Sequence, residues 1–411
     1  MTRPHVLIAG ASIAGPALAM WLGRRGWDVT VVEQAPSFRT GGQNIDVRGA
    51  AREVLRRAGL EDAVRAATTG EVGTRFLGEG GRVVAEFPAE RSATIGPTAE
   101  LEVLRGDLAR ILLDAGDGST TYRYGDRATA LTDTGDDVRV SFAHGPDQRF
   151  DLVVAADGMR STTRRLAFGD EAVVRPLGME MSYLTIPRTD TDTDWWNWYS
   201  EPGGLAVHLR PDRHGTTRAL LTAVTSGAGG GAGESAADGG GRRSREDQED
   251  RLRRQFRDVG WEAPRVLAAL GGAEDLYSES IGQVRAPRWT NGRVALLGDA
   301  AWCASPVSGM GTSLSLVGAY VLAGELTAHA DHREAFARYE EVMRPYVAQA
   351  QHLPPGVPHL ANPRSRAGLA AFRLGLRVAA TPALGRLGGR LFSPPADAVD
   401  LPDHGRLEQA G

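Results

Sequence analysis

The chain has 411 residues, 42% of them hydrophobic, and a formal net charge of −4. This length predicts two or three structural units with a large core. The slight negative charge gives no basic field of the kind that nucleic-acid-binding proteins use. All 47 basic residues are arginine, so no lysine can form a Schiff base or serve a P-loop. A single cysteine, Cys303, excludes an intramolecular disulfide, and the histidine spacing predicts no metal site.

The first elements predicted along the chain form a βαβ unit. Its parts are an apolar strand, a turn, a helix and a second apolar strand, at residues 5–9, 10–15, 16–26 and 28–33. The next segments are predicted as a helix, a hairpin, a second helix and three strands, at 49–67, 72–87, 99–115, 121–131, 137–143 and 152–155. The hairpin interrupts an otherwise alternating α/β pattern.

The second half of the chain begins with a β-rich segment at about 176–225 and a Gly/Ser/Ala-rich segment at 226–245. The remaining predicted elements are a charged helix, a buried strand, a long apolar helix and a mostly helical C-terminal part, at 246–259, 293–297, 311–327 and 333–395. Because β structure interrupts the α/β elements twice, we expect an α/β fold, α+β overall. It would combine a Rossmann-like domain with an inserted, mostly antiparallel sheet domain and C-terminal helices.

The domain boundaries follow from these shifts in pattern. The nucleotide-binding domain is expected to be discontinuous, at 1–72, 96–175 and 276–345. The inserted sheet domain takes 73–95 and 176–275, with a flexible loop at 226–245, and a helical segment takes 346–411. No run reaches the roughly 18 apolar residues of a membrane-spanning helix, so the chain is expected to be soluble and cytoplasmic.

The turn at residues 10–15 reads GASIAG and nearly matches the dinucleotide fingerprint G-x-G-x-x-G. Gly10 and Gly15 are present, and Ser12 stands at the middle position. Serine is small enough for a pyrophosphate to approach, and its hydroxyl can donate to phosphate. Glu33 ends the second strand, where its carboxylate can accept from ribose hydroxyls. This motif predicts a dinucleotide site and leaves NAD and FAD as alternatives.

A second motif, GDAAWCASPVSGMGTS at residues 298–313, distinguishes the two cofactors. Asp299 follows a buried strand, where it can bind ribityl hydroxyls. Backbone N–H groups near 309–312 can face the pyrimidine edge of a flavin. A third motif, ADGMRSTTRR at 156–165, also follows a strand. Together these motifs favour FAD.

GASIAG, Glu33, Arg105 of LEVLRGDL, the Asp157-Gly158 pair and GDAA…GMG occur in a family-specific order. The chain resembles the class A flavoprotein monooxygenases of the para-hydroxybenzoate hydroxylase fold, over about residues 5–345. Within that family it is most similar to the tetracycline-modifying and polyketide-tailoring aromatic hydroxylases. The resemblance implies bound FAD, NAD(P)H as a transient reductant and O2 as co-substrate.

The resemblance also implies the residues that hold FAD. They are Gly10, Ser12, Ile13, Ala14, Gly15, Glu33, Gln34, Arg39, Arg105, Asp157, Gly158, Asp299, Pro306, Gly309, Met310, Gly311 and Thr312. The chain departs from the family pattern at Ser12, and at Trp302 and Cys303, where other members often carry other residues.

Four residues are candidates for catalysis or substrate binding. Arg48 lies in the glycine-containing segment GGQNIDVRG and faces either the flavin and substrate or the surface. Trp196 and Trp198 share one face of a predicted strand, where they form either a stacking wall or core packing. His208 is a candidate base for a phenol, with a hydrogen-bonded sheet histidine as the alternative.

The predicted reaction is hydroxylation of a small aromatic or polyketide-like substrate through a flavin C4a-hydroperoxide, as in antibiotic biosynthesis. Baeyer–Villiger insertion and epoxidation are variants of the same chemistry. The alternatives are an FAD-dependent dehydrogenase or oxidase, an NAD-dependent enzyme without flavin, and a non-catalytic flavin-binding protein. The expected partner is a small-molecule substrate, without nucleic acid or stable membrane association, for a monomer or homodimer.

Overall fold

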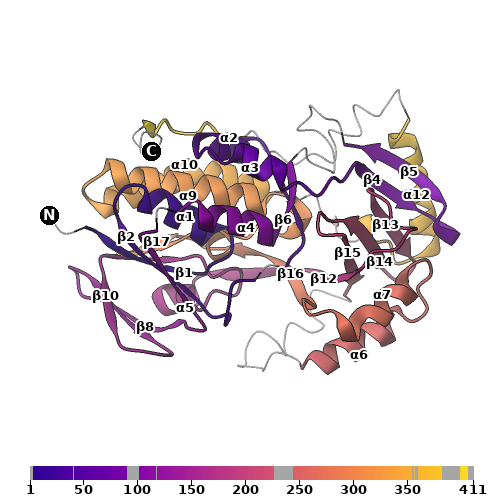
Figure 1. Cartoon of the computed structure of the whole chain (residues 1–411), viewed down its shortest axis with the longest axis horizontal. Helices are drawn as coiled ribbons and strands as arrows, with labels where there is room; N and C mark the ends of the chain where they lie inside the picture. Colours follow the sequence, from indigo (N-terminus) through magenta and orange to yellow (C-terminus); the bar gives the residue numbers. More distant parts are fainter. Residues whose placement is uncertain are drawn as a thin grey trace.

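The computed structural model describes residues 3–39, 41–89, 101–116, 118–225, 244–353, 356, 360–381 and 399–405. Most of the predicted flexible loop, 226–243, lies outside the described residues. Figure 1 shows two parts side by side, one around the N-terminal strands and the other around β4, β5 and β12–β15. In the described ranges, no helix has the length and apolar character needed to cross a bilayer.

The first part is built on a six-stranded sheet in the order β17-β18-β11-β1-β2-β7. Its strands are Thr290–Asn291, Val294–Leu296, Leu152–Ala155, His5–Ala9, Asp28–Glu33 and Thr120–Tyr124. All neighbours pair in parallel except β17 and β18. The predicted βαβ unit is therefore confirmed, with β1 at the centre of the sheet.

Helices and two small sheets surround this sheet. The helices are α1 Ala14–Gly23, α2 Ala50–Arg57, α3 Glu61–Ala66, α4 Arg105–Asp114, α5 Thr162–Phe168, α8 Asp299–Trp302, α9 Gly311–Ala328 and α10 His332–Ala350. One small sheet pairs β3 (Asn44–Val47) with β6 (Leu101–Leu104). The other joins β8 (Ala128–Asp133), β9 (Val138–Phe142) and β10 (Gln148–Phe150).

The second part is a seven-stranded sheet in the order β16-β12-β15-β14-β13-β4-β5. Its strands are Tyr277–Arg285, Val173–Pro187, Thr216–Val224, Leu205–Pro211, Trp196–Glu201, Gly73–Leu77 and Val83–Pro88. Only β13 and β4 pair in parallel, so the sheet is mostly antiparallel, as predicted. β16 belongs to this sheet, which therefore extends past the predicted boundary at residue 276.

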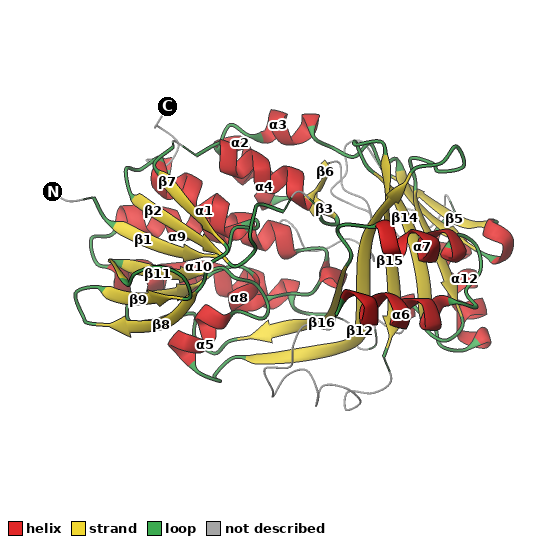
Figure 2. Cartoon of the chain, turned by 60° about the horizontal axis from the view of Figure 1, so that its bottom comes forward, coloured by secondary structure: helices red, strands yellow, loops and turns green. Residues whose placement is uncertain are grey.

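Different helices pack on the two faces of the seven-stranded sheet. Helices α6 (Arg245–Phe256) and α7 (Ala263–Ala269) pack on the face that carries Leu77 and Tyr199 (Figure 2). Helix α12 (Arg366–Ala379) packs on the other face, against Phe76 and Trp198. Side chains alternate along a strand, so Trp198 and Tyr199 point to opposite faces. Of this second face, α12 covers only part, and the rest borders the site described below.

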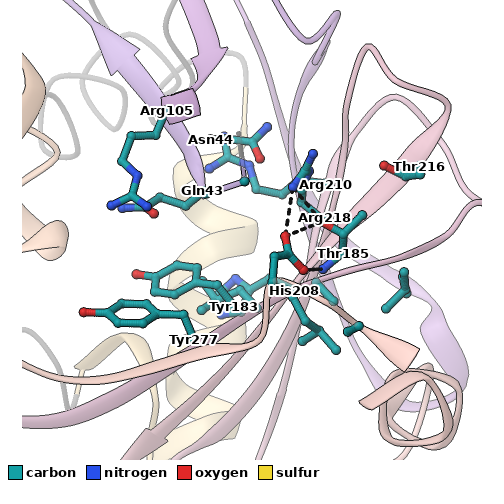
Figure 3. A pocket seen from close by; sticks show the side chains of 18 of the residues that line it. Gln43, Asn44, Arg105, Tyr183, Thr185, His208, Arg210, Thr216, Arg218 and Tyr277 are labelled. Carbon is teal, nitrogen blue, oxygen red and sulfur yellow. Dashed lines mark hydrogen bonds and ion pairs between the residues drawn. The ribbon is translucent and has the colours of Figure 1, made fainter. Parts of the chain in front are cut away.

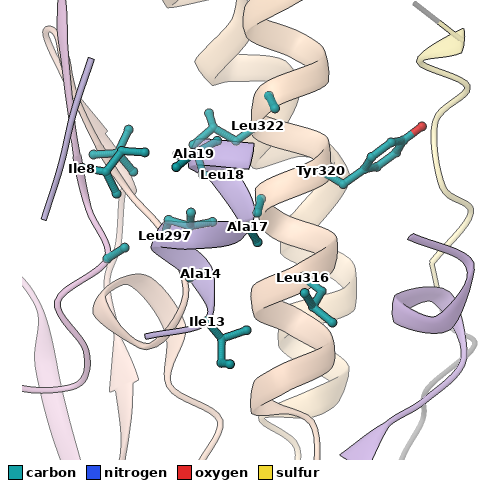
Figure 4. Close-up of a cluster of buried hydrophobic side chains, with 14 of the residues drawn as sticks. Ile8, Ile13, Ala14, Ala17, Leu18, Ala19, Leu297, Leu316, Tyr320 and Leu322 are labelled. Atoms are coloured by element: carbon teal, nitrogen blue, oxygen red, sulfur yellow. The ribbon is translucent and has the colours of Figure 1, made fainter. Parts of the chain in front are cut away.

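The core of the first part fixes the position of α1. All ten residues of α1 are buried, between the six-stranded sheet and α9. Figure 4 shows Ala14, Ala17 and Leu18 of α1 between Leu297 on one side and Leu316 on the other. Small side chains on α1 let the two helices approach closely. The N-terminus of α1 is thus held rigidly at the end of β1.

Two predicted helices differ from the structure. The helix expected at 99–115 is a strand, β6, followed by α4, because Leu101 and Leu104 pair with β3. The leucine spacing favours a helix, but tertiary pairing decides. The helix expected at 49–67 is two helices, α2 and α3, because Gly59 between them has a left-handed φ of +71°.

Candidate active site

A cavity of about 1370 Å³ lies where the carboxyl ends of the parallel strands face the seven-stranded sheet. A second cavity of about 1420 Å³ extends along the seven-stranded sheet. The two share lining residues, which include Arg39, Arg105, Trp196, Trp198 and Arg210. They are called the nucleotide cavity and the sheet cavity below. Their shared wall marks the place where a group bound in one would meet a group bound in the other.

The GASIAG turn forms one end of the nucleotide cavity. Gly10 has φ of +109°, and a Cβ there would lie 2.4 Å from the carbonyl oxygen of Ala156. Ser12 is exposed to the cavity. Gly15 does not line it: a Cβ on Gly15 would lie 1.9 Å from the Gly10 oxygen, so this glycine allows the helix to start. Gly10 and Gly15 are therefore needed for different steric reasons, whereas Ser12 faces the cavity.

The N-terminus of α1 faces this end of the cavity with free N–H groups. Among the described residues, no side chain caps α1, and its first turn holds no acidic residue. The first N–H groups of a helix lack intrahelical partners, and the helix dipole adds positive potential there. Ser12, Ile13 and Ala14 line the cavity at this point. The arrangement can bind a phosphate or pyrophosphate.

Glu33 lies at the end of β2 and lines the same cavity. Its carboxylate accepts hydrogen bonds from the backbone N–H groups of Ala11 at 3.0 Å and Ala35 at 2.9 Å. These bonds fix the carboxylate beside the turn. A carboxylate oxygen has two acceptor positions, so Glu33 keeps capacity for ribose hydroxyls.

The Asp157-Gly158 motif is tied to the GDAA motif through one buried arginine. Asp157 accepts from the Ser161 hydroxyl and from the Thr163 N–H at 3.0 Å, and thereby holds the start of α5. Arg164 then donates to the carbonyl oxygens of Met159 at 2.9 Å and Ala300 at 2.8 Å. The sequence analysis missed Arg164, although it stands within the third motif.

The GDAA…GMG segment forms the far end of the cavity. Asp299, Pro306, Gly309, Gly311 and Thr312 all line the cavity. Burial by the surrounding protein raises the pKa of Asp299. In the described chain α9 also begins without a side-chain cap or an acidic first turn.

The Met310 side chain is fully buried and, unlike its neighbours, does not line the cavity. The N–H groups of Gly309 and Met310 donate to the Pro306 carbonyl at 3.1 Å and to the Ser308 hydroxyl at 3.2 Å, so the N–H groups from Gly311 onward are the ones that can face an anionic ring edge.

Three arginines border the cavities between these two ends. Arg48 is 2% exposed, so it is not a surface arginine, and it donates to the Asp46 carboxylate at 2.9 Å. Arg39 and Arg105 line both cavities. Gly42 has φ of +138°, and a Cβ there would lie 2.8 Å from the Arg105 Nε. This glycine therefore lets Arg105 lie against the loop.

Aromatic side chains, called the aromatic wall below, line the cavities on the side of α12, which itself contributes Phe372 to the nucleotide cavity. The Trp196 and Trp198 rings stack with centroids 5.5 Å apart at 15°, and both line both cavities. Trp198 also packs against Phe76, at 5.0 Å between centroids. The structure is therefore compatible with both interpretations of this tryptophan pair, a stacking wall and core packing. One surface of the pair borders the cavity, and the other packs on the core.

His208 lies beside the two tryptophans and lines the sheet cavity. Trp196 donates its Nε1–H to His208 Nδ1 at 3.2 Å, and the Trp198 ring centroid is 4.5 Å away. Burial, and then the charge of Arg210, lower the pKa of His208 to about 3. A neutral imidazole whose acceptor nitrogen is already occupied is a poor proton acceptor. In the folded chain His208 accepts a hydrogen bond from Trp196, and its role as the base stays a prediction.

Several cavity residues were missed from the sequence. Figure 3 shows Arg105 and Gln43 on one side of the sheet cavity and the rings of Tyr183 and Tyr277 on the other. The two tyrosine rings stack at 6.5 Å. Arg210 is two residues from His208 on β14, so the alternation of the strand could have identified it. The tyrosines lie on neighbouring strands β12 and β16, which no sequence pattern brings together.

The nucleotide cavity fits FAD. A phosphate-binding helix start and a ribose-binding carboxylate lie at one end, and Asp299 with the start of α9 lies at the other. All residues assigned to FAD from the sequence line this cavity except Gly15 and Met310. No group of three or more His, Cys, Asp or Glu in the described ranges could hold a metal.

Comparisons with known proteins agree with this cofactor. A family model described as an FAD binding domain matches residues 3–352. The chain is 38% identical over 352 residues to a flavin-dependent monooxygenase of an unknown prokaryotic organism, covering 85% of this chain and 88% of that protein. It is 34% identical over 434 residues to the flavin-dependent monooxygenase eupH of a Phoma species, covering 98% of each.

Among solved structures, the tetracycline destructase Tet(55) matches with a TM-score of 0.76 and 33% identity, covering 98% of this chain and 99% of that chain. The tetracycline destructase Tet(51) matches with a TM-score of 0.79 and 29% identity, covering 98% and 100%. The order of the motifs, the cavity and these relatives agree. The chain belongs to the family of FAD-dependent class A flavoprotein monooxygenases.

Proposed function

We propose that this FAD-dependent monooxygenase hydroxylates a planar aromatic substrate held between the Trp196–Trp198 wall and the flavin ring. One observation carries the proposal: the two stacked indoles line both cavities where these meet. Bound FAD supplies O2 activation after reduction by NAD(P)H. The chain positions the substrate and excludes water, because aromatic faces favour stacking with planar rings.

The residues proposed to hold FAD have separate tasks. Ser12 and the start of α1 bind the pyrophosphate, Glu33 the adenine-side ribose, and Asp299 the ribityl chain. The start of α9 stabilises negative charge on the reduced ring. Arg48 is proposed to border the flavin ring on the substrate side, with its orientation fixed by Asp46.

Apolar side chains support the exclusion of water from the reaction. Phe76, Phe87 and Phe372 line the nucleotide cavity near the aromatic wall, together with Leu353 and Leu360. An apolar lining strengthens electrostatic interactions in the site and protects reactive species from hydrolysis. The proposed oxygen transfer needs such protection more than it needs an acid or base, in line with the neutral state of His208.

The size of the sheet cavity supports a polycyclic or polyketide-like substrate. Its volume, about 1420 Å³, exceeds that of ordinary drug-sized pockets. Two similar structures are tetracycline destructases, and tetracycline is a polyketide. Baeyer–Villiger insertion and epoxidation use the same placement and remain variants of the proposal.

The proposal is tested by turnover with aromatic polyketide candidates under ¹⁸O2. The expected result is NAD(P)H consumption that the substrate stimulates, and a product heavier by one ¹⁸O atom. The rival function is a dehydrogenase or oxidase, which would take hydride from the substrate itself. Anaerobic bleaching of the flavin by substrate, without NAD(P)H, would establish that rival and exclude hydroxylation.

We also propose that the enzyme works in the cytoplasm as a monomer or homodimer, without nucleic acid or stable membrane association. The free, buried thiol of Cys303 is typical of a reducing compartment. Light scattering of the purified holoenzyme gives the oligomeric state, and fractionation of the producing cells gives the compartment. A trimer or larger assembly, or recovery with membranes, would contradict the proposal.

A further inference from the structure

A buried cluster of charged side chains lies where the two parts of the molecule meet. It consists of Asp46, Arg48, Glu71, Glu102 and Arg210 and is called the joint cluster below. Asp46 and Glu102 come from the small sheet of the FAD-binding part, and Arg210 from β14 of the seven-stranded sheet. Glu71 lies just before β4. The Glu71 side chain is 0% exposed and that of Glu102 is 3% exposed.

Arg210 connects this cluster to the aromatic wall. Its guanidinium lies over the Trp196 ring, 4.1 Å from the centroid. Its Nε lies 2.8 Å from Glu71 Oε2, and its Nη2 lies 2.5 Å from Glu102 Oε2. A planar guanidinium can stack and form two ion pairs at once, whereas an ammonium group cannot.

Glu102 extends the connection to the loop beside the flavin site. Its Oε1 accepts from Asn44 Nδ2 at 2.7 Å and from the Thr69 hydroxyl at 3.2 Å. Asn44 also donates to the carbonyl oxygen of Pro211 at 3.2 Å, directly after Arg210. Gln43, next to Asn44, lines both cavities. A continuous chain of contacts thus runs from Trp196 through Arg210 and Glu102 to the 41–48 loop.

The joint cluster holds one more carboxyl group than guanidinium groups. Three carboxyl groups face two guanidinium groups, and the one titratable neighbour on β14, His208, is neutral because burial lowers its pKa. Glu71 and Glu102 both pair with the Arg210 guanidinium, so two buried carboxyl groups share one positive charge. Burial raises the pKa of Glu102, and Glu71 and Asp46 raise it further against the opposing charge of Arg210. An uncompensated charge at this depth would be costly.

We propose that Arg210 is a positioning residue of the monooxygenase. It fixes the Trp196 ring relative to the flavin-side loop through Glu102, and a proton shared by Glu71 and Glu102 keeps the joint cluster neutral. This inference rests on the proposed function, in which Trp196 contacts the substrate. The Arg210 guanidinium pairs with the two glutamates, and Arg210 also lines both cavities. The inferred effect of Arg210 on the substrate is through the position of Trp196.

The first test compares Arg210→Met with a matched control, Arg75→Met. Arg75 also lies over a tryptophan, Trp195 at 4.5 Å, and pairs with a glutamate, Glu86 at 2.8 Å. It lines neither cavity. Arg210→Met is expected to raise the KM for substrate about tenfold, while kcat and the substrate-free rate of flavin reduction change less than threefold. Arg75→Met is expected to leave all three near wild type.

Arg210→Lys keeps the positive charge but loses the planar guanidinium that lies over Trp196, so it is expected to raise KM less than Arg210→Met. If Arg210→Met yields no folded holoenzyme, Arg210→Lys is compared with Arg75→Lys instead. Equal KM values for the Arg210 and Arg75 variants would overturn the positioning role.

The second test needs no substrate, so it tests the shared proton even if the proposed function is wrong. A carboxyl with a raised pKa keeps its proton in the folded state while the unfolded chain loses it, so wild-type stability falls as pH rises above about 4.5. The Glu102→Gln variant has no carboxyl group at this position, so its stability does not fall for this reason as pH rises. The difference in melting temperature, variant minus wild type, is therefore expected to increase from pH 5 to pH 7. A difference that stays constant would overturn the shared proton.

Discussion

At the scale of single residues, the first motif shows how closely sequence and geometry agree. Gly10 adopts a φ of +109°, and a Cβ there would collide with the backbone of Ala156. Ser12 replaces the middle glycine at a point where the residue is exposed and lines the cavity. The motif therefore tolerates serine at position 12 and no side chain at position 10.

Gly10→Ala is expected to destabilise the fold by more than about 2 kcal/mol, because an unfavourable φ adds to a backbone clash. It is also expected to lower the flavin bound per folded chain. Gly26→Ala is the control: Gly26 has φ of +75°, but a Cβ there would meet nothing within 4 Å. This control should lose about 1 kcal/mol and keep its flavin. Urea unfolding and flavin absorbance measure both effects.

A second prediction at this scale concerns His208 and pH. The unfolded chain protonates this histidine near pH 6.5, whereas the folded chain keeps it neutral down to a pKa of about 3. Folding stability is thus lost as pH falls below 6.5, by about 2 kcal/mol at pH 5 from this residue. His208→Gln should remove that part of the pH dependence.

If the pH dependence of unfolding is the same in His208→Gln and wild type, then His208 is not held in its neutral form in the folded chain. The pH profile of kcat/KM between 6 and 8 is expected to keep its shape in this variant. A lost ionisation there would support His208 as a base.

At the scale of elements, the starts of two helices define the ends of the nucleotide cavity. α1 and α9 both begin without a capping side chain in the described chain. Four helices, α5, α6, α10 and α12, begin at a serine or aspartate whose side chain accepts a backbone N–H, and of these the start of α5 also lines the nucleotide cavity. Uncapped starts are not confined to α1 and α9, since within the described ranges α2, α3, α4, α7 and α8 also lack a capping side chain. Free helix N–H groups are available to a ligand, and capped ones are not.

Ser12→Asp tests this use of α1. A carboxylate at this position would occupy the helix start and repel a pyrophosphate, so the Kd for FAD is expected to rise at least about tenfold. Ser12→Gly, which completes the fingerprint, should bind FAD within about threefold of wild type. Flavin fluorescence titration of the apoprotein gives both constants. Equal affinity in the aspartate variant would remove α1 from the phosphate site.

Much of the element order could be read from the chain because the signals were local. The β1–α1–β2 unit needs only apolar runs and one turn, and the hairpin at 72–87 needs only alternation. The strand at Leu101–Leu104 was misread, since its leucines fit a helical period and only pairing with β3 makes them a strand. Glu71, Glu102 and Arg210 come together from three distant segments, so no spacing could reveal the joint cluster.

At the scale of the whole molecule, FAD is expected to stabilise the fold by joining segments that are distant in the sequence. Removal of FAD should lower the melting temperature, and added FAD at 100 times its Kd should restore about 2.7 kcal/mol. NAD⁺ at the same concentration is the control and should restore little. Thermal unfolding monitored by circular dichroism measures this. Stabilisation by NAD⁺ equal to that by FAD would contradict the assignment of the cavity.

The ladder between β12 and β16 runs from the FAD-binding part into the seven-stranded sheet (Figure 2). It is interrupted once, between Pro176 and Glu180, where Gly178 has φ of +68°. Paired strands resist sliding along each other but bend where their hydrogen bonds stop. We expect any opening of the cavities to bend the sheet at this interruption, so that the aromatic wall tilts away from the flavin site.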